Sequence, residues 1–363
     1  MNVLIINSAK EWGGTEKWAV NTAIGLAQRG HTVFFGCRGT LYEKKFAGST
    51  VTIAKFPFAN NIDVVSIVLL RSFMRKHRID VVMPTKQREY FLAGLAAQLF
   101  TSTKVAAMFA IERRIHNLRN WIAFCTLFDV VFVCARKIIN VLAKTKGFNK
   151  AKCRLVYMGV ESIRISGEIR KNQRKSLRLY DNDICIMTIG RLCEQKGFDH
   201  AIKAFARFAK KYSNVKLVIV GGGDGTVFRQ QADKAGVADR LILTGFRDDV
   251  PALVQAADMY WLTSRSEGVP NTMLEAMAAK IPVVAFDIAG VSEILKDGIN
   301  GFLVPFEDSE GMVSATLKLI GDHDLRRRIG EAGYQTVTND FSLKKMTDDT
   351  EKYLKELLGF QAA

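Results

Sequence analysis

The chain has 363 residues, of which 48% are hydrophobic and 24% charged, and its formal net charge is +16. This length exceeds one ordinary hydrophobic core and predicts two domains of roughly 150–200 residues each. No apolar run approaches the roughly 18–20 residues that a membrane span requires, and the first residues, MNVLIINSAKEW, lack the basic region of a signal peptide. These features exclude a membrane-spanning protein and predict a cytoplasmic one.

The net charge belongs to one half of the chain. Residues 1–165 contain 25 Lys and Arg against 9 Asp and Glu, whereas residues 166–363 contain 27 of each kind. A one-sided basic field attracts nucleic acid, an anionic membrane or a phosphorylated substrate, and charge alone does not choose among them. The simpler alternative is a basic face that only keeps the protein soluble.

Short apolar, β-branched runs alternate with longer amphipathic stretches along the chain. This pattern is typical of parallel sheets covered by helices on both faces. In the first half, strands are predicted over 3–7, 31–37, 51–56, 80–84, 104–110, 129–135 and 154–158. In the second half, they are predicted over 184–190, 216–222, 241–246, 259–264, 283–288 and 301–305.

The polar, basic segment at 161–176 interrupts this alternation, so we predict a linker over 161–175. The fold class is therefore α/β, with two doubly wound, Rossmann-like domains facing each other across a cleft. The expected domains are 1–165 and 166–340. Terminal helices are predicted after residue 320, and we expect 341–363 to return to the first domain.

Two loops that follow predicted strands have the features of phosphate sites. Gly13 and Gly14 stand immediately before an amphipathic helix, where free backbone N–H groups can face an anion. A second loop, after the strand at 184–190, carries Arg191 and Lys196 just before another helix. The alternative for these two cations is a pair of solvated surface charges.

A third loop, SEGVPNTMLE, contains two glutamates eight positions apart, Glu267 and Glu275. The residues between them include Gly268 and Pro270, which disfavour a continuous helix and place the helix start at Asn271 or Thr272. Glu275 also has a structural interpretation, because Thr272-x-x-Glu275 matches a capping box. Glu267 has no such alternative.

Three segments together resemble the family 4 glycosyltransferases, which have the GT-B fold and include transferases of the lipopolysaccharide core and cell envelope. They are GGTEKWAVNTAIGLAQRGHTV, GRLCEQKGFDHAIKAFA and EGVPNTMLEAMAAKIPVVAFDIAGVSEILKDGINGFLVP. The resemblance covers nearly the whole second domain. It implies a retaining hexosyltransferase that uses a nucleotide-diphosphate sugar, with UDP expected ahead of GDP.

The resemblance also implies a donor site on specific residues. In it, Glu267 would contact the sugar hydroxyls and Glu275 the ribose, Arg191 and Lys196 would neutralise the diphosphate, and Gly14 would approach it from the other domain. The other residues of the site would supply backbone contacts to the donor or border the nucleotide base. The full set is Gly13, Gly14, Arg191, Lys196, Phe246, Arg247, Glu267, Gly268, Val269, Pro270, Asn271, Thr272 and Glu275.

The sequence departs from the family in two places. Val269 stands where relatives often have a bulky aromatic residue. A family histidine after the fifth strand of the first domain has a counterpart in His116, a few residues later than expected, with Glu112 as a rival and a surface helix residue as the alternative for both.

No essential metal or other cofactor is expected. The six cysteines occur singly, without zinc spacing. Asp181 and Asp183 match the D-x-D motif of the other major glycosyltransferase fold, but they precede a strand instead of ending one. The run Gly221–Gly225 imitates a dinucleotide fingerprint without its third glycine, and is interpreted as a chance match.

In the mechanism that we favour, Glu267, Arg191, Lys196 and His116 act at the reacting groups while configuration is retained. Paired carboxylates of a glycosidase would flank the sugar from opposite faces, which one loop cannot provide. We expect the basic N-terminal domain to bind an anionic acceptor, such as lipopolysaccharide core, at the inner face of the cytoplasmic membrane. The candidate contact segments are 67–79 and 112–121.

Other functions stay open at this point. A nucleic-acid partner is not expected, because no known binding motif is present and aromatic residues do not alternate with the basic runs. A GDP-sugar transferase of another polysaccharide pathway, a catalytically silent sugar-nucleotide-binding protein and a sugar phosphorylase all remain compatible with the phosphate loops.

Overall fold

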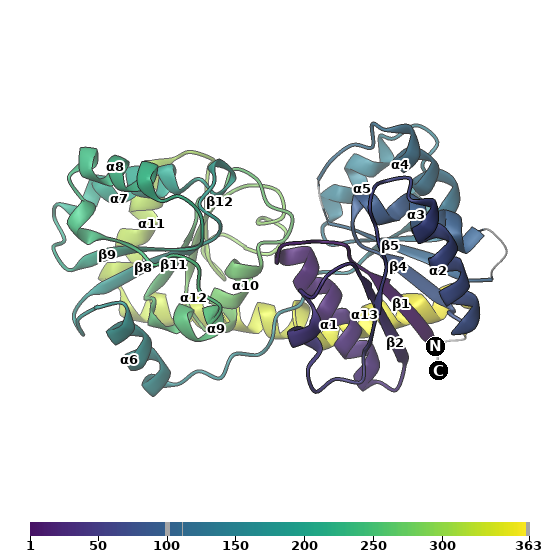
Figure 1. Cartoon of the computed structure of the whole chain (residues 1–363). Coiled ribbons are helices and arrows are strands. Elements are labelled where there is room, and N and C mark those ends of the chain that lie inside the picture. The colour runs from purple at the N-terminus through teal and green to yellow at the C-terminus, as the bar shows by residue number, and fades with distance from the viewer. Residues whose placement is uncertain (99–101, 111, 361–363) are drawn as a thin grey trace. The chain divides into compact units, whose positions relative to one another are not determined.

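A computed structural model of the chain describes residues 1–98, 102–110 and 112–360 (Figure 1). The chain divides into two compact units: unit 1 is Met1–Gly159 with Leu343–Ala363, and unit 2 is Val160–Ser342. The sequence analysis places the boundaries after residues 165 and 340, and the structure places them after 159 and 342. Residues 361–363, part of the predicted terminal segment, lie outside the described residues.

Unit 1 is built on a parallel sheet with the strand order β3-β2-β1-β4-β5-β6-β7. The five inner strands are largely apolar and buried, so they form a continuous hydrophobic layer between helices, whereas the two edge strands are partly exposed. All seven predicted strands of this half are confirmed, with small differences at their ends. They are β1 (Asn2–Ile6), β2 (Thr32–Cys37), β3 (Thr52–Lys55), β4 (Val81–Pro84), β5 (Lys104–Phe109), β6 (Val130–Val133) and β7 (Cys153–Leu155).

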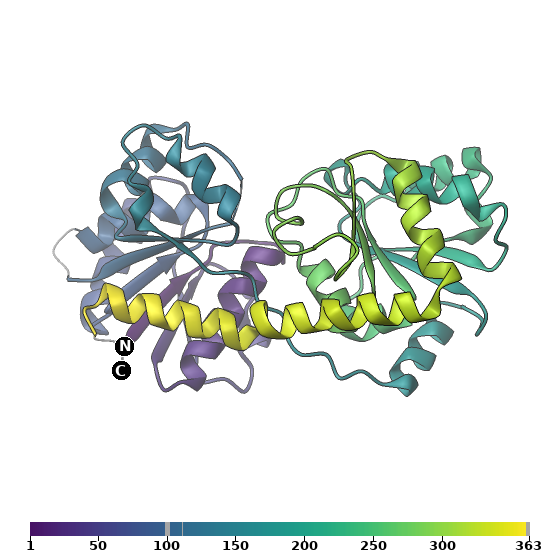
Figure 2. The same ribbon diagram turned by 180° about the vertical axis from the view of Figure 1, so that it is seen from behind.

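The helices of unit 1 connect these strands and cover the sheet. Helices α2 and α3 pack side by side, and α13 packs on α1 although the two are at opposite ends of the chain (Figures 1 and 2). The helices are α1 (Gly14–Gln28), α2 (Val64–Lys76), α3 (Gln87–Gln98), α4 (Leu118–Ile122), α5 (Arg136–Ala143) and α13 (Leu343–Leu357).

Unit 2 repeats the plan with a parallel sheet in the order β10-β9-β8-β11-β12-β13. The six strands predicted for this half are also confirmed. They are β8 (Ile184–Ile189), β9 (Val215–Val220), β10 (Leu241–Leu243), β11 (Met259–Leu262), β12 (Val283–Phe286) and β13 (Phe302–Val304). Because the order reverses between β8 and β11, the loops after these two strands meet at the carboxyl edge of the sheet, where α/β folds bind ligands.

The helices of unit 2 bury apolar stripes on both faces of its sheet. In α7, for example, Phe198, Ile202 and Phe205 recur at helical spacing and lie in the core. The helices are α6 (Gly167–Ser176), α7 (Phe198–Ala209), α8 (Thr226–Ala235), α9 (Val250–Leu253), α10 (Asn271–Ala278), α11 (Ser309–Gly321) and α12 (His323–Asp340). None of the described helices of either unit combines the length and apolar character needed to cross a membrane.

The linker predicted over 161–175 is wrong for most of its length, because α6 occupies 167–176. The segment is polar, yet it forms a helix that packs on the rest of unit 2. Arginine side chains make the packing contacts that an apolar stripe usually makes. Arg174 is buried and donates to the backbone carbonyls of Tyr180 and Asp183, each at 2.6 Å. Arg170 pairs with Asp258 at 2.7 Å.

Candidate active site

In unit 2, the loop after β8 is fastened to the loop after β11. The backbone N–H of Arg265 donates to the Gln195 carbonyl at 2.8 Å, and the Gln195 side chain donates to the Ser266 carbonyl at 3.0 Å. The Arg265 guanidinium binds both carboxylate oxygens of Asp199, at 2.9 and 2.7 Å. The segments that carry Lys196 and Glu267 are therefore fixed to each other by several bonds.

Two glycines allow further backbone contacts at this edge of the sheet. A Cβ on Gly290, whose φ is +84°, would lie 1.6 Å from the Gly268 carbonyl oxygen. A Cβ on Gly221 would lie 1.7 Å from the Gly190 carbonyl oxygen. Only glycine permits these approaches. The interpretation of Gly221–Gly225 as a chance match misses this role, since the contact joins loops that are separated in sequence.

The structure brings Lys196 and Glu267 together. The Lys196 Nζ lies 2.7 Å from Glu267 Oε1, and the Ser264 hydroxyl donates to the same oxygen at 2.6 Å. Both side chains are largely buried, with exposed fractions of 21% for Lys196 and 9% for Glu267. Among the described residues, no hydrogen bond is recorded to the second oxygen, Oε2, so it can accept one from a ligand. Sequence reasoning did not identify Ser264.

Helix α10 begins at Asn271, within the predicted range, but the capping box does not form. Thr272 lies inside the helix, and its hydroxyl is 2.7 Å from the Tyr260 hydroxyl. Pro270 stands at the N-cap without a side-chain bond, so the first N–H groups of α10 keep their capacity for a ligand. The buried Oδ1 of Asn271 has no hydrogen-bond partner among the described residues.

The remaining predicted donor residues of unit 2 differ in their exposure. Arg191 is exposed and Val269 is half-buried. Glu275 lies on α10 and is only 6% exposed. Phe246 is 72% exposed and borders Gly222, whereas Arg247 forms a two-bond ion pair with Asp249, at 2.7 and 2.6 Å. Arg247 is thus engaged within the protein.

The D-x-D pair stands in the turn before β8. Asp183 is buried and accepts the backbone N–H of Tyr180 at 2.8 Å, while Asp181 is exposed. In the described part of the chain, no three His, Cys, Asp or Glu side chains gather in a way that could hold a metal ion.

In unit 1, Gly13 and Gly14 stand at the start of α1, as predicted, with Gly13 at the N-cap in an extended conformation. A residue that sequence reasoning missed lies in the first turn: Glu16 is 3% exposed and forms an ion pair with Lys86. A carboxylate at this end of a helix is stabilised by the positive end of its dipole. The sequence could have indicated this residue, because a glutamate in the first turn of the helix after Gly13–Gly14 is typical of a stabilised helix N-terminus.

A second buried carboxylate, Glu89, joins the loop after β1 to the loop after β4. It accepts backbone N–H groups from Ser8, from Thr85 at 3.0 Å and from Lys86 at 3.1 Å. Burial raises the pKa of Glu89 to about 7, even though these bonds act in the opposite direction. Glu89 and Glu16 together brace the residues beside the Gly13–Gly14 turn.

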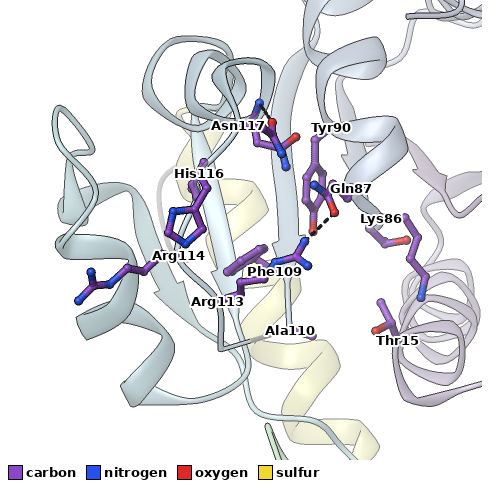
Figure 3. A pocket seen from close by; sticks show the side chains of 13 residues that line it. Thr15, Lys86, Gln87, Tyr90, Phe109, Ala110, Arg113, Arg114, His116 and Asn117 are labelled. Atoms are coloured by element: carbon purple, nitrogen blue, oxygen red, sulfur yellow. Dashed lines mark hydrogen bonds between the residues drawn. The ribbon is translucent and has the colours of Figure 1, made fainter. Parts of the chain in front are cut away.

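A pocket of about 400 Å³ opens in unit 1 beyond the ends of β4 and β5 (Figure 3). His116 lines it, whereas its rival Glu112 is absent from the lining and pairs with Lys137 at 3.0 Å. Figure 3 shows the Arg113 side chain directed toward Gln87, to which it donates at 2.6 Å, and the Arg114 side chain directed away. The lining carries four basic or titratable nitrogen side chains: Lys86, Arg113, Arg114 and His116.

Comparison with known families accounts for both halves of the chain. The model of Glycosyltransferase Family 4 matches residues 12–164, and the model of Glycosyl transferases group 1 matches residues 169–336. The chain belongs to the family 4 glycosyltransferases. The resemblance seen in the three sequence segments is thereby confirmed, and the two parallel-sheet units are those of the GT-B fold.

Individual relatives of this family 4 glycosyltransferase span part or all of the chain. The lipopolysaccharide core biosynthesis glycosyltransferase LpsE of Rhizobium meliloti is 33% identical over 45% of the chain, and the chain spans about half of LpsE, 47%. A glycosyltransferase from Rickettsia africae has the same fold, with a TM-score of 0.89, 20% identity and 99% of each chain covered. HepE of Anabaena, crystallised with UDP and glucose, has a TM-score of 0.85 at 19% identity, covering 98% of this chain and 100% of HepE.

Proposed function

We propose that the protein transfers a hexose from a UDP-sugar to an anionic glycan or glycolipid of the cell envelope, such as lipopolysaccharide core, with retention of configuration and without an essential metal. The observation that carries this proposal is the Lys196–Glu267 pair. It places a cation and a hydrogen-bond acceptor on two loops that are fixed to each other beside the free N-terminus of α10.

In the proposed reaction, the bond between the sugar C1 and the diphosphate oxygen breaks while a bond from C1 to the acceptor oxygen forms on the same face. The acceptor's proton passes to the departing diphosphate oxygen. Negative charge develops on the diphosphate, and Arg191, Lys196 and the N–H groups at the start of α10 stabilise it without reorganisation. Glu267 would orient the sugar through its hydroxyls, using the open oxygen Oε2.

The donor nucleotide is inferred from a structural neighbour. HepE shares the fold and was crystallised with UDP and glucose, which supports a uridine nucleotide here. The roles of Glu275 at the ribose, Phe246 and Arg247 at the base, and Gly13 and Gly14 at the diphosphate are part of the same proposal. Because Arg247 already binds Asp249, we assign the border of the base mainly to Phe246.

The distribution of charged residues between the two units supports an anionic acceptor. Unit 1 contains 28 Lys and Arg against 12 Asp and Glu, while unit 2 contains 24 of each. Among the basic residues that line the pocket of about 400 Å³ in unit 1, Arg113 points across it toward Gln87, whereas Lys86 is paired with Glu16 and Arg114 is directed away. The relative LpsE is named for lipopolysaccharide core biosynthesis, which agrees with an acceptor that carries phosphate or carboxylate groups.

The proposal is tested by transfer assays with candidate UDP- and GDP-sugars on deacylated lipopolysaccharide fragments, after a thermal-shift screen for donors. We expect Glu267→Ala and Lys196→Ala to lower kcat at least 100-fold, because each removes a contact to the reacting donor. Lys203→Ala, an exposed lysine on α7 in the same unit, serves as the matched control and should leave kcat unchanged.

Three results would contradict the proposal. Wild-type rates in Glu267→Ala or Lys196→Ala would remove the assigned site. Donor binding without transfer or hydrolysis would indicate a silent sugar-nucleotide-binding protein, and turnover that requires inorganic phosphate would indicate a phosphorylase. Circular dichroism of each variant establishes that the fold is intact.

A further inference from the structure

The first half of α2, together with Ile62 just before it, exposes an unusual number of aliphatic side chains. Most large apolar residues of the chain are buried, yet here five near neighbours in sequence are between 43% and 65% exposed. We call them the α2 face: Ile62, Val64, Val65, Val68 and Leu69.

The α2 face is separate from the side of the helix that packs on unit 1. Ile67, Leu70 and Met74 recur at helical spacing and are 8%, 0% and 1% exposed, so they hold α2 in the core. The sequence analysis offers 67–79 as a contact segment, with a core helix as its alternative. The structure assigns the apolar residues of that segment mainly to the core, and the exposed aliphatic residues begin five positions earlier.

Basic residues continue the outer surface of α2 toward its end. Arg75, Lys76 and Arg78 are exposed, and no ion pair is recorded for any of them among the described residues. The helix itself contains no acidic residue. The carboxylate that precedes it, Asp63, is buried and accepts the Ser66 N–H and hydroxyl, at 3.1 and 2.6 Å, as the N-cap. The surface is thus apolar at one end, cationic at the other, and free of exposed negative charge.

We propose that the α2 face docks the protein on an anionic lipid bilayer, with the aliphatic residues entering the interface and Arg75, Lys76 and Arg78 facing lipid phosphates. Apolar side chains beside lysine and arginine are the composition of surface-bound membrane helices. A protein partner would be indicated by aromatic anchors in a pocket, whereas the exposed apolar side chains of this face are all aliphatic. The charge of unit 1 has the sign that attracts an anionic leaflet.

This inference does not rest on the proposed function, since adsorption to lipid requires neither donor nor acceptor. Vesicle binding tests the docking proposal and sugar transfer tests the proposed function, so either proposal can fail while the other holds. A protein that transfers sugar to soluble acceptor fragments but ignores vesicles would overturn only the docking proposal.

The test is co-sedimentation of the full chain with vesicles of phosphatidylcholine alone or with 30% phosphatidylglycerol, at low salt and at 0.5 M salt. We expect binding only to the anionic vesicles and weaker binding at high salt. Val65→Glu should lower the partition coefficient at least tenfold. The matched control is Val227→Glu, because Val227 is 55% exposed and is likewise the second residue of its helix, α8, in unit 2.

A second pair of variants tests the cationic end. Arg75→Glu with Lys76→Glu should weaken binding by about fivefold or more per position, since each basic residue near an anionic surface contributes about 1 kcal/mol. Lys210→Glu with Lys211→Glu makes the same change in net charge on two exposed lysines of unit 2 and should have less effect.

The proposal is overturned if Val65→Glu binds as wild type, if the two charge-reversal pairs lose binding equally, or if wild type binds neutral vesicles as well as anionic ones. It is also overturned if the chain does not sediment with vesicles but self-associates in solution through a contact that Val65→Glu abolishes. Unchanged thermal unfolding of the variants shows that a loss of binding does not come from a loss of folding.

Discussion

At the scale of single residues, the carboxylate of Glu267 has two unequal oxygens. Oε1 receives both the Lys196 ammonium and the Ser264 hydroxyl, and this fixes the side chain without using Oε2. A group held in this way can bind a sugar hydroxyl with little loss of side-chain entropy. In the proposed mechanism, the same pairing would keep the charge of Lys196 in place before the diphosphate binds.

His116 and Glu112 give a prediction that separates two neighbouring candidates. We expect His116→Ala to lower the transfer rate at least tenfold, because His116 lines the pocket of unit 1. Glu112→Ala should have less than a twofold effect, since Glu112 pairs with Lys137 outside the pocket lining. Steady-state kinetics on both variants decides between them, and a larger loss in Glu112→Ala would reverse the assignment.

The proposal that protein groups neutralise the leaving diphosphate predicts how the transfer rate responds to removal of metal ions. If Arg191, Lys196 and backbone N–H groups neutralise the leaving diphosphate, turnover should be unchanged within a factor of two after treatment with EDTA. The measurement is the transfer rate before and after chelation, with Mg²⁺ and Mn²⁺ added back. Loss of activity that either ion restores would contradict the metal-free mechanism.

At the scale of elements, the loops of unit 2 depend on backbone contacts. Gly290→Ala should unfold or displace the 267–272 segment, because the new methyl would overlap the Gly268 carbonyl. We expect a destabilisation of more than about 2 kcal/mol and a loss of donor binding, measured by denaturant unfolding and by thermal shift with UDP.

The control for this prediction is Gly298→Ala. Gly298 also has a positive φ, +69°, but nothing lies within 4 Å of a Cβ added there. The substitution should lower the free energy of unfolding by only about 1 kcal/mol, because alanine disfavours a positive φ, and it should leave donor binding intact. Equal effects of the two variants would show that the contact with Gly268 does not matter.

Much of the fold could be predicted from sequence because its strands are buried on both faces. A run such as VVMP in β4 is apolar throughout, and even strands that contain a basic residue, such as β9 with VKLVIV, are apolar enough that all thirteen strands could be predicted in order. The helix α6 was missed for the opposite reason. Its packing depends on Arg170 and Arg174, and a basic segment without an apolar stripe gives no periodic signal.

The candidate site was predicted in part. Glu267 and Lys196 stand in quoted motifs, but their pairing joins positions 71 residues apart and needed the structure. The role of Gly221 was not identified because its partner, Gly190, lies in another loop. Ser264 was missed although its partner, Glu267, is only three residues away, because a serine at that spacing belongs to no recognised motif. Thr272 shows a local rule overridden by packing: the capping box was available, yet the hydroxyl binds Tyr260 from the neighbouring strand.

At the scale of the whole molecule, unit 1 combines the two ends of the chain. The strands and helices before residue 160 pack with α13, and ion pairs fasten the joint. Arg29 binds Asp348 and Glu351, at 2.6 and 2.7 Å, and His31 lies 3.1 Å from Glu351. Lys355 approaches the same carboxylate at 2.6 Å.

This joint predicts a pH dependence of stability. Partial burial would raise the pKa of Glu351, but hydrogen bonds from Lys355, Arg29 and His31 outweigh it and lower the pKa to about 2. Because the folded-state pKa is below the ordinary value of 4.5, the stabilisation is present above about pH 4.5 and is lost as the pH falls toward 2.

Glu351→Gln should therefore reduce stability by about 1 kcal/mol at pH 7, after allowance for solvent screening. The difference from wild type should shrink between pH 4.5 and 2. Thermal unfolding across this range measures it. Glu356→Gln, an exposed position on the same helix, is the control, and a similar loss there would mean that the ion pairs at Glu351 contribute nothing specific.

The discontinuous make-up of unit 1 also has a consequence for the order of folding during synthesis. All strands of unit 1 leave the ribosome before any strand of unit 2, yet α13, which packs on α1, emerges after unit 2 is complete. Unit 2 can therefore complete its folding first, while the side of α1 that binds α13 stays exposed in the nascent unit 1. Chaperones that shield apolar surfaces on nascent chains would then be needed at the beginning of the chain for longest.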